Sequence, residues 1–287
     1  MTVDRRTVLR SSARLAALSA TGGLVAACGE TAEQNASGPA SFAARVQPSH
    51  LNTEGPAAGG LPAAPSGTPT APPPTPSTPP ASPPLAAGTP DEVVNGPRDR
   101  KQVALTFHGQ GDPALATAIL TTAEQHGARL TVMVVGTWLD QQPAMARRIL
   151  DGGHELGNHT QNHLDISTMA PQQAHDEIAQ CAQRLQKLTG SIGRWFRPSA
   201  AQYANAMVRQ QAKLVGYQHC LSFDVDPRDY SDPGADVVQR RLLKSVQGGS
   251  VVALHMGHKG TLDALPGILD GLKGMGLSVV TASQLCA

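Results

Sequence analysis

Two histidines stand four residues apart near the middle of the chain, a spacing that suits metal binding. His159 and His163 lie in a polar stretch that follows a short strand-like run, 154–158. Neutral imidazole is the commonest side-chain ligand for zinc-like cations, and this spacing lets two rings converge on one ion. An isolated pair of this kind is more typical of a polar surface loop. The polar residues elsewhere in the chain decide between the two interpretations.

Residues whose side chains could take part in catalysis or metal binding stand where predicted strands end. They are His108, His159 with His163, Arg197, Asp224 with Asp226, and His255. In α/β barrels the carboxyl ends of the strands form one rim, and the loops there assemble the active site. Five strands that each deliver a titratable side chain to one rim are difficult to obtain by chance. This order favours an active site over a set of solvated surface residues.

The elements that must position these residues alternate between strand and helix. Repeated β-α units imply a parallel sheet with right-handed crossovers. We therefore predict an α/β fold, a distorted (β/α) barrel with about seven parallel strands, preceded by a disordered linker. Strands are expected over 102–107, 130–135, 154–158, 194–196, 218–223, 250–255 and 277–280, and helices over 112–127, 143–150, 171–188, 205–214, 235–246 and 262–275.

The first 28 residues are typical of an export signal. Arg5 and Arg6 resemble a twin-arginine start, and the apolar stretch that follows is too short and too rich in Ala, Gly and Ser to span a bilayer. It ends in Val-Ala-Ala-Cys at Cys28, similar to the lipobox of bacterial lipoproteins, whose cysteine is lipidated. An ordinary secretory peptide is the alternative. We expect twin-arginine export, then attachment to the outer face of the cell membrane through lipidated Cys28, or secretion.

Residues 29–97 are rich in Pro, Ala, Ser and Thr and contain few large apolar side chains. Such a segment buries too little apolar surface to offset the entropy of ordering its backbone, so we expect a disordered linker. This leaves 98–287 as one globular domain, which is long enough to bury a substantial core. The linker would tether that domain to the anchored Cys28.

Charge and cysteine content narrow the set of partners. The formal net charge is +1, which provides no electrostatic basis for binding nucleic acid. We expect a monomer that contacts a membrane only through Cys28. Beyond Cys28 the chain has three cysteines, Cys181, Cys220 and Cys286, so they cannot all pair with one another. Cys181 and Cys220 are predicted to be small buried residues.

The ordered segments together resemble the polysaccharide deacetylases of the NodB homology type, carbohydrate esterase family four. The resemblance covers about residues 101–285 and implies a distorted seven-stranded barrel that removes acetyl groups from N-acetylated sugars with a divalent metal. It implies that His159 and His163 hold the metal, that Arg197 positions the catalytic base, and that His255 is the general acid. The matching segments are 103–107, 159–163, 196–198, 224–230 and 252–255.

The chain departs from the family at the first motif. The family has two aspartates after Thr-Phe, the first a general base and the second a metal ligand, whereas this chain has His108 and Gly109. Three outcomes stay open. His108 is a third metal-binding imidazole, or it replaces the base while Asp112 assists the metal, or the domain is a catalytically silent relative. We also expect Arg197 to pair with Asp226 or Asp229, which makes Asp226 a candidate catalytic residue.

The leading functional hypothesis is a metal-dependent hydrolase that removes acetyl from N-acetylated sugars of a cell-wall or extracellular polysaccharide. The expected metal is zinc, with cobalt or nickel as alternatives, because imidazole accepts all three. The expected partner is an acetylated glycan. The alternative hypotheses are a lipoprotein of this type that binds glycan without turnover and a hydrolase of another non-peptide carbon–nitrogen bond.

Overall fold

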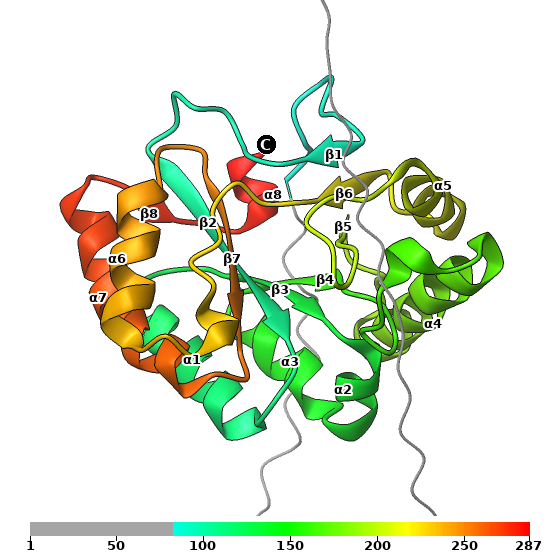
Figure 1. The fold of residues 1–287 in the computed structure, drawn as a ribbon, viewed down its shortest axis with the longest axis horizontal. Helices are drawn as coiled ribbons and strands as arrows, with labels where there is room; N and C mark the ends of the chain where they lie inside the picture. Colours follow the sequence, from blue (N-terminus) through cyan, green and yellow to red (C-terminus); the bar gives the residue numbers. More distant parts are fainter. Residues whose placement is uncertain (1–82) are drawn as a thin grey trace, which may run out of the picture. The chain divides into compact units, whose positions relative to one another are not determined.

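The computed structural model of the chain describes residues 83–287 (Figure 1). The predicted signal segment, the lipobox cysteine Cys28 and most of the predicted linker lie outside the described residues. No helix in the described part is long and apolar enough to cross a membrane.

Eight strands form one parallel sheet. Seven of them follow the order β1-β6-β5-β4-β3-β2-β7, and β8 pairs with the amino-terminal end of β2. Beyond β6, Val225 forms a parallel bridge with Val252 of β7, and the amide of Asp224 donates to Val251 O at 3.1 Å. The sheet therefore curls until its two sides meet, which confirms the predicted α/β fold and distorted (β/α) barrel. The strands are β1 (Glu92–Val93), β2 (Gln102–Gly109), β3 (Thr131–Val134), β4 (Glu155–Asn158), β5 (Trp195–Phe196), β6 (His219–Leu221), β7 (Val251–His255) and β8 (Ser278–Val279).

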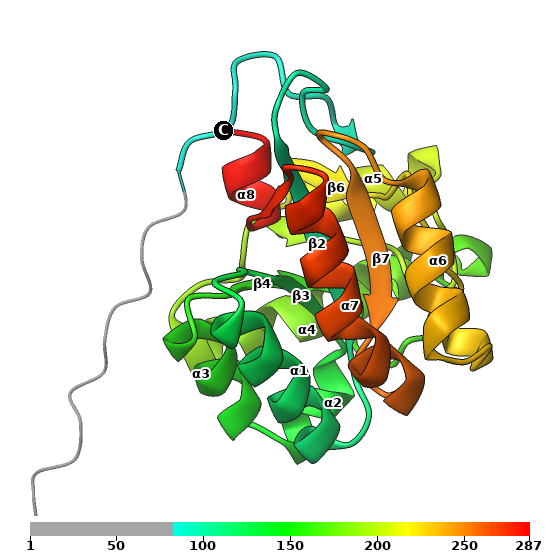
Figure 2. The same ribbon diagram turned by 90° about the vertical axis from the view of Figure 1, so that its left-hand side faces the viewer.

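Helices cover the outer face of this curled sheet (Figures 1 and 2). The local signals are those expected from the chain: Asp112 caps α1 by accepting from Ala114 N, and Gly190 ends α4 in the left-handed conformation, with φ of 77°. The short helix α2 was not predicted. The helices are α1 (Pro113–Gln125), α2 (Gly136–Gln141), α3 (Ala144–Asp151), α4 (Pro171–Thr189), α5 (Ala206–Val215), α6 (Ala235–Ser245), α7 (Lys259–Gly274) and α8 (Ala282–Leu285).

The alternation of side chains along β2 explains which residues face the barrel interior. Leu105 and Phe107 lie in the large apolar cluster between the sheet and the helices, whereas Ala104 belongs to a second cluster inside the curl. Side chains two residues apart share a face of a strand. Thr106 and His108 therefore face inward with Ala104, and His108 reaches the interior at the carboxyl end of the strand.

The opposite end of the barrel is closed by α8. Ala282 N donates to Thr131 Oγ1 at 2.8 Å, and Ser283 donates to the buried carboxylate of Glu155 at the start of β4. Ala86 N donates to Cys286 O at 3.0 Å, so the described chain begins at this closed end. Strand β1 lies within the range that the sequence assigned to the linker, and it pairs with β6.

The three described cysteines are free and buried, which confirms the prediction for Cys181 and Cys220. Burial raises the pKa of each thiol, to about 12 for Cys181 and Cys220 and to about 11 for Cys286.

Candidate active site

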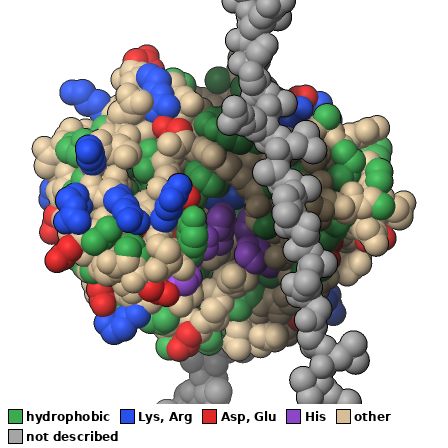
Figure 3. All heavy atoms as spheres, viewed as in Figure 1, with side chains coloured by type: hydrophobic (Ala, Val, Ile, Leu, Met, Phe, Trp, Pro, Cys, Tyr) green, Lys and Arg blue, Asp and Glu red, His purple; other side chains and the backbone are tan. Residues whose placement is uncertain are grey.

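The carboxyl ends of four strands, β2, β4, β5 and β7, bring the predicted residues together. His108 is the second-last residue of β2 and pairs in register with His255, which ends β7. His159 follows β4, and Arg197 follows β5. Histidine side chains gather at the centre of one face of the molecule (Figure 3). The site is therefore built from segments that lie up to 147 residues apart in the sequence.

His108 makes a hydrogen bond with each of its ring nitrogens. Its Nε2 lies 3.3 Å from Nη1 of Arg197, and its Nδ1 lies 2.8 Å from Nε2 of His255. A guanidinium only donates, so Nε2 of His108 is the acceptor and the proton of the neutral ring is on Nδ1. His108 then donates to His255, whose own proton must lie on Nδ1.

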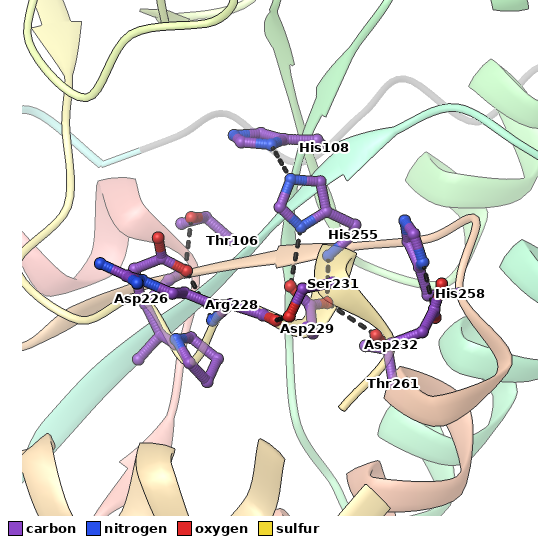
Figure 4. A network of polar contacts seen from close by, with 12 residues as sticks. Thr106, His108, Asp226, Arg228, Asp229, Ser231, Asp232, His255, His258 and Thr261 are labelled. Atoms are coloured by element: carbon purple, nitrogen blue, oxygen red, sulfur yellow. Dashed lines mark hydrogen bonds and ion pairs between the residues drawn. The ribbon is translucent and has the colours of Figure 1, made fainter. Parts of the chain in front are cut away.

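The far side of His255 is held by a buried carboxylate. His255 Nδ1 lies 2.8 Å from Asp229 Oδ1, and its backbone N–H donates to Asp229 Oδ2 at 2.8 Å (Figure 4). Thr261 also donates to Asp229 Oδ2, at 2.6 Å. Asp229 is 1% exposed. The hydrogen bonds therefore run in one direction, from Arg197 through His108 and His255 to Asp229.

His159 and His163 are arranged as a pair of metal ligands. Their Nε2 atoms lie 3.2 Å apart, and His159 Nδ1 lies 3.0 Å from Arg197 O. That carbonyl accepts the Nδ1 proton, which leaves the lone pair of His159 on Nε2. Two nitrogens at zinc-ligand distance across a tetrahedral angle lie about 3.3–3.4 Å apart. The two residues therefore fit a divalent metal as two of its ligands.

The family's third protein ligand has no equivalent in this site. Gly109 has no side chain, and the His108 ring stacks on His159 with centroids 4.2 Å apart and planes at 14°. Lone pairs lie in the plane of an imidazole, so stacked rings do not aim at one ion. No group of three His, Cys, Asp or Glu in residues 83–287 is placed to hold a metal. The expected three-histidine centre is therefore not formed.

Asp112, which the sequence offered as an additional metal ligand, caps a helix instead. It is exposed, and its Oδ1 accepts from Ala114 N at 2.8 Å to cap α1. Its place in the turn after β2 follows from helix capping rather than from the site.

Arg197 is fully buried, and it binds carbonyls rather than a carboxylate. Its Nε donates to Leu221 O at 2.7 Å, and its Nη2 donates to Ser222 O at 3.2 Å. The guanidinium also lies over the Phe223 ring, 5.3 Å from its centroid. Burial lowers the pKa of Arg197 to about 9, which still leaves it charged at neutral pH.

The pairing of Arg197 with Asp226 or Asp229 that the sequence suggested does not occur. Asp226 is exposed and accepts from Arg228 N at 2.7 Å in its own turn, while Asp229 holds His255. Asp224 binds Arg98 at 2.8 Å. The reason is position: the Arg197 side chain is fully buried, whereas Asp226 is exposed. In the described part of the chain, the hydrogen bond of the Asp226 carboxylate is the one within its own turn.

The imidazoles of His108, His159 and His163 are neutral near pH 7. Burial lowers the pKa of His108 and of His159 well below the ordinary value, and the neighbouring ring of His159 or His163 adds to the effect. Burial also lowers the pKa of His163. Neutral rings keep the lone pairs that metal binding requires.

The sequence did not predict the contacts of two buried carboxylates near the site, Asp229 and Glu177. Asp229 was considered as a partner of Arg197, and the structure places it on His255. Glu177 of α4, which contacts the loop between the two histidines, was not singled out. A signal for Glu177 does exist: a carboxylate stands at helical spacing among Ala174, Ile178 and Cys181, the buried face of the helix.

Comparisons with known proteins identify the family of this chain. The family described as polysaccharide deacetylase matches residues 95–220. A peptidoglycan-N-acetylglucosamine deacetylase of Bacillus cereus is 33% identical over 193 residues, which is 66% of this chain and 90% of that protein. A chitooligosaccharide deacetylase of Rhizobium leguminosarum is 33% identical over 169 residues, 57% of this chain and 73% of that protein.

Among solved structures, a CE4 family pseudoenzyme from Bacillus anthracis superposes with a TM-score of 0.65. It is 24% identical, over 69% of this chain and 70% of that one, and this likeness shows the shared fold. The relatives, the barrel and the ordered motifs lead to one conclusion. The chain belongs to the polysaccharide deacetylase family, the NodB homology domains of carbohydrate esterase family four, which are hydrolases of non-peptide carbon–nitrogen bonds.

Proposed function

We propose that this domain removes the acetyl group from N-acetylated amino sugars of a cell-wall or other extracellular polysaccharide. The observation that carries the proposal is the position of His255, held by the buried Asp229, at the same rim as the His159–His163 pair. The names of the Bacillus and Rhizobium relatives, which specify peptidoglycan and chitooligosaccharide deacetylases, support this class of substrate.

In the proposed reaction His255 supplies the proton that the leaving amine requires. Asp229 orients the ring through Nδ1 and stabilises the imidazolium form. His108 is the proposed base: its Nε2 takes the proton of the attacking water once Arg197 Nη1 releases that nitrogen, and its Nδ1 proton passes to Nε2 of His255. His255 then becomes the imidazolium that gives a proton to the leaving amine. Before the reaction, Arg197 holds His108 in its tautomer and orientation.

A divalent metal, which we propose to be zinc with cobalt or nickel as substitutes, would be held by His159 and His163. When bound, it would supply Lewis acidity to the acetamide carbonyl. The remaining coordination positions would be open to water or substrate, because this chain provides no third side chain at Gly109. The chain's own contribution is to keep Nε2 of His159 unprotonated through the Arg197 carbonyl.

The test is acetate release from N-acetylglucosamine oligomers by the purified protein. We expect release that stops with a chelator and returns with zinc or cobalt. A His159→Ala, His163→Ala double variant should lose it. His126→Ala with His175→Ala is the matched control, because these two rings lie on α1's end and on α4, away from the site. Full activity in the first double variant would refute the proposal.

A second candidate is glycan binding without turnover, and the observation that favours it is Gly109. The Bacillus anthracis protein of the same fold is described as a pseudoenzyme, and a mutant of it as having restored enzymatic activity. This candidate predicts saturable binding of the oligomers with no acetate at any metal concentration. Hydrolysis of another non-peptide carbon–nitrogen bond is the third alternative, which a panel of small amides separates from the first two.

We further propose twin-arginine export and anchoring of a monomer to the outer face of the membrane through lipidated Cys28, with secretion as the alternative. The motifs that support this lie outside the described residues. The position of residue 86 at the closed end of the barrel also supports it, because a tether there leaves the opposite rim accessible to a polysaccharide. A Cys28→Ser variant should move from the membrane fraction to the medium.

A further inference from the structure

The loop between the two metal-binding histidines has an unfavourable backbone conformation. Thr160 has φ of 69° and His163 has φ of 59°, and neither residue is glycine. The left-handed region is uncommon for such residues and persists only where the surroundings impose it. The contacts that hold this loop therefore determine where the His163 ring lies.

The first half of the loop is held by backbone hydrogen bonds from α2. Gly136 N donates to Thr160 O, and Thr137 N donates to Gln161 O, both at 2.9 Å. These bonds end before Asn162. His163 N itself donates only within the loop, to Thr160 Oγ1 at 3.2 Å.

The second half of the loop is held by Glu177. Asn162 donates twice to this carboxylate, from its backbone N to Oε2 at 2.8 Å and from Nδ2 to Oε1 at 2.5 Å. Glu177 is 8% exposed and stands on the buried face of α4, whose other residues pack on the sheet. The pair thus connects the residue next to His163 to a 19-residue helix.

Charge strengthens this connection. Hydrogen bonds to an ionised acceptor are stronger than neutral ones, and two parallel bonds from one residue also fix orientation. Residues that orient metal ligands from outside the coordination shell commonly change metal affinity by about 10–100-fold when they are substituted.

We propose that Glu177 is a positioning residue that sets the separation of His163 from His159 through Asn162, and thereby sets the affinity for the metal. This inference rests on the metal-binding part of the proposed function. Glu177 touches neither histidine side chain, so its effect is transmitted through the backbone of the loop.

The test uses a charge-conserving exchange. Asn162→Asp removes the Nδ2 donor and places a second carboxylate against Glu177, so it should weaken cobalt binding, followed by absorption titration, by about tenfold or more. In the double variant Asn162→Asp, Glu177→Gln, the new amide donates to the new carboxylate and accepts from the backbone N–H of residue 162. The double variant should regain cobalt affinity to within about threefold of the wild-type protein.

Glu124→Gln is the matched control, because Glu124 also accepts two bonds from one residue, Arg148, far from the site. It should lose stability and keep cobalt affinity. Hydrogen exchange at the amide of residue 162, measured without metal, should be faster in Asn162→Asp and slow again in the double variant. Unchanged cobalt affinity in Asn162→Asp, or no recovery in the double variant, would overturn the inference.

Failure of this inference is distinguishable from failure of the proposed function. A wild-type protein that binds cobalt but releases no acetate refutes the deacetylase and leaves the role of Glu177 standing on the titration. A wild-type protein that releases acetate without taking up cobalt overturns the role of Glu177 and leaves the deacetylase standing.

Discussion

The Nδ1 atom of His108 lies 2.8 Å from Nε2 of His255, across two strands that pair in register at these residues. An aspartate at position 108 would only accept hydrogen bonds and would form an ion pair with Arg197. The imidazole instead accepts from Arg197 and donates to His255. Replacing a carboxylate by histidine thus converts an ion pair into a directional chain of hydrogen bonds that runs from Arg197 through two imidazole rings to Asp229.

The direction of the hydrogen bonds from Arg197 to Asp229 fixes the tautomers of His108 and His255, which NMR can observe. At pH 7, without metal, nitrogen NMR of the histidine rings should show His108 and His255 both as the tautomer with the proton on Nδ1. The reason is that Arg197 Nη1 can only donate to His108 Nε2. A His108 ring protonated on Nε2 would contradict the chain of bonds.

Asp229 should be the most sensitive residue of the site after the histidines. Asp229→Asn places its NH2 against either the ring N–H or the backbone N–H of His255, so the ring loses its tautomer and orientation. We expect kcat for acetate release to fall about a thousandfold or more. Asp232→Asn is the control, because that exposed side chain binds the half-buried His258 at 2.9 Å rather than His255. It should stay within about twofold of wild type.

Gly109→Asp restores the family's missing carboxylate and should raise zinc affinity at least about tenfold, measured by competition titration. It should also cost about 1–3 kcal/mol of unfolding free energy, because a Cβ at this position lies 2.8 Å from Val132 Cγ1 and 3.1 Å from Val134 Cγ1. Val132→Ala in the same chain should recover part of that stability. Unchanged zinc affinity in both variants would show that a carboxylate at position 109 does not reach the His159–His163 pair.

Glu155 makes stability depend on pH at the closed end of the barrel. Burial raises its pKa above the ordinary 4.5, although hydrogen bonds from Ser283 and Thr131 partly oppose the effect. The folded protein then keeps this proton to higher pH than the unfolded chain does. The contribution of Glu155 to stability is therefore greatest below pH 4.5 and falls as pH rises through the folded-state pKa.

Glu155→Gln removes this ionisation. The Gln side chain stays neutral, its oxygen can accept from Thr131 Oγ1 and Ser283 N, and its NH2 can donate to Ser283 Oγ, so this variant should be about as stable as wild type at pH 4. Relative to wild type it should gain stability toward pH 7, which denaturant unfolding at both pH values measures. A wild-type protein that gains stability relative to the variant as pH rises would contradict the raised pKa.

The described thiols should be unreactive in the folded protein. Cys181, Cys220 and Cys286 are buried, and burial raises the pKa of each thiol to about 11 or 12. In a Cys28→Ser variant we expect fewer than about one in ten of these thiols to react with a disulfide reagent at pH 8 within minutes. All three should react in denaturant. Rapid modification of the native protein would contradict their burial.

Much of the fold was predictable because its signals are local. Strand β2 and helix α1 follow from an apolar run and from the Asp112–Pro113 start of a helix, both of which act within a few residues. Helix α2 was missed because it has six residues and no side-chain cap. Strand β1 was assigned to the linker because its two residues gain their pairing only from β6.

The candidate site was predictable as a set of residues and not as a set of contacts. The order of the motifs was enough to select His108, His159, His163, Arg197 and His255. It did not show that Arg197 would bind carbonyls of β6 instead of Asp226, or that His108 would stack on His159. Those outcomes depend on which way each side chain points from a curled sheet.

The sequence by itself determined the alternation of strands and helices and the parallel barrel. It also determined that position 109 has no carboxylate. Only the tertiary structure decided the partner of each nitrogen: Arg197 and His255 for His108, Asp229 for His255, and Glu177 for the loop before His163. Hydrogen bonds form over about 3 Å, whereas these partners lie 15 to 147 residues apart along the chain. Such distances close only when the whole sheet curls.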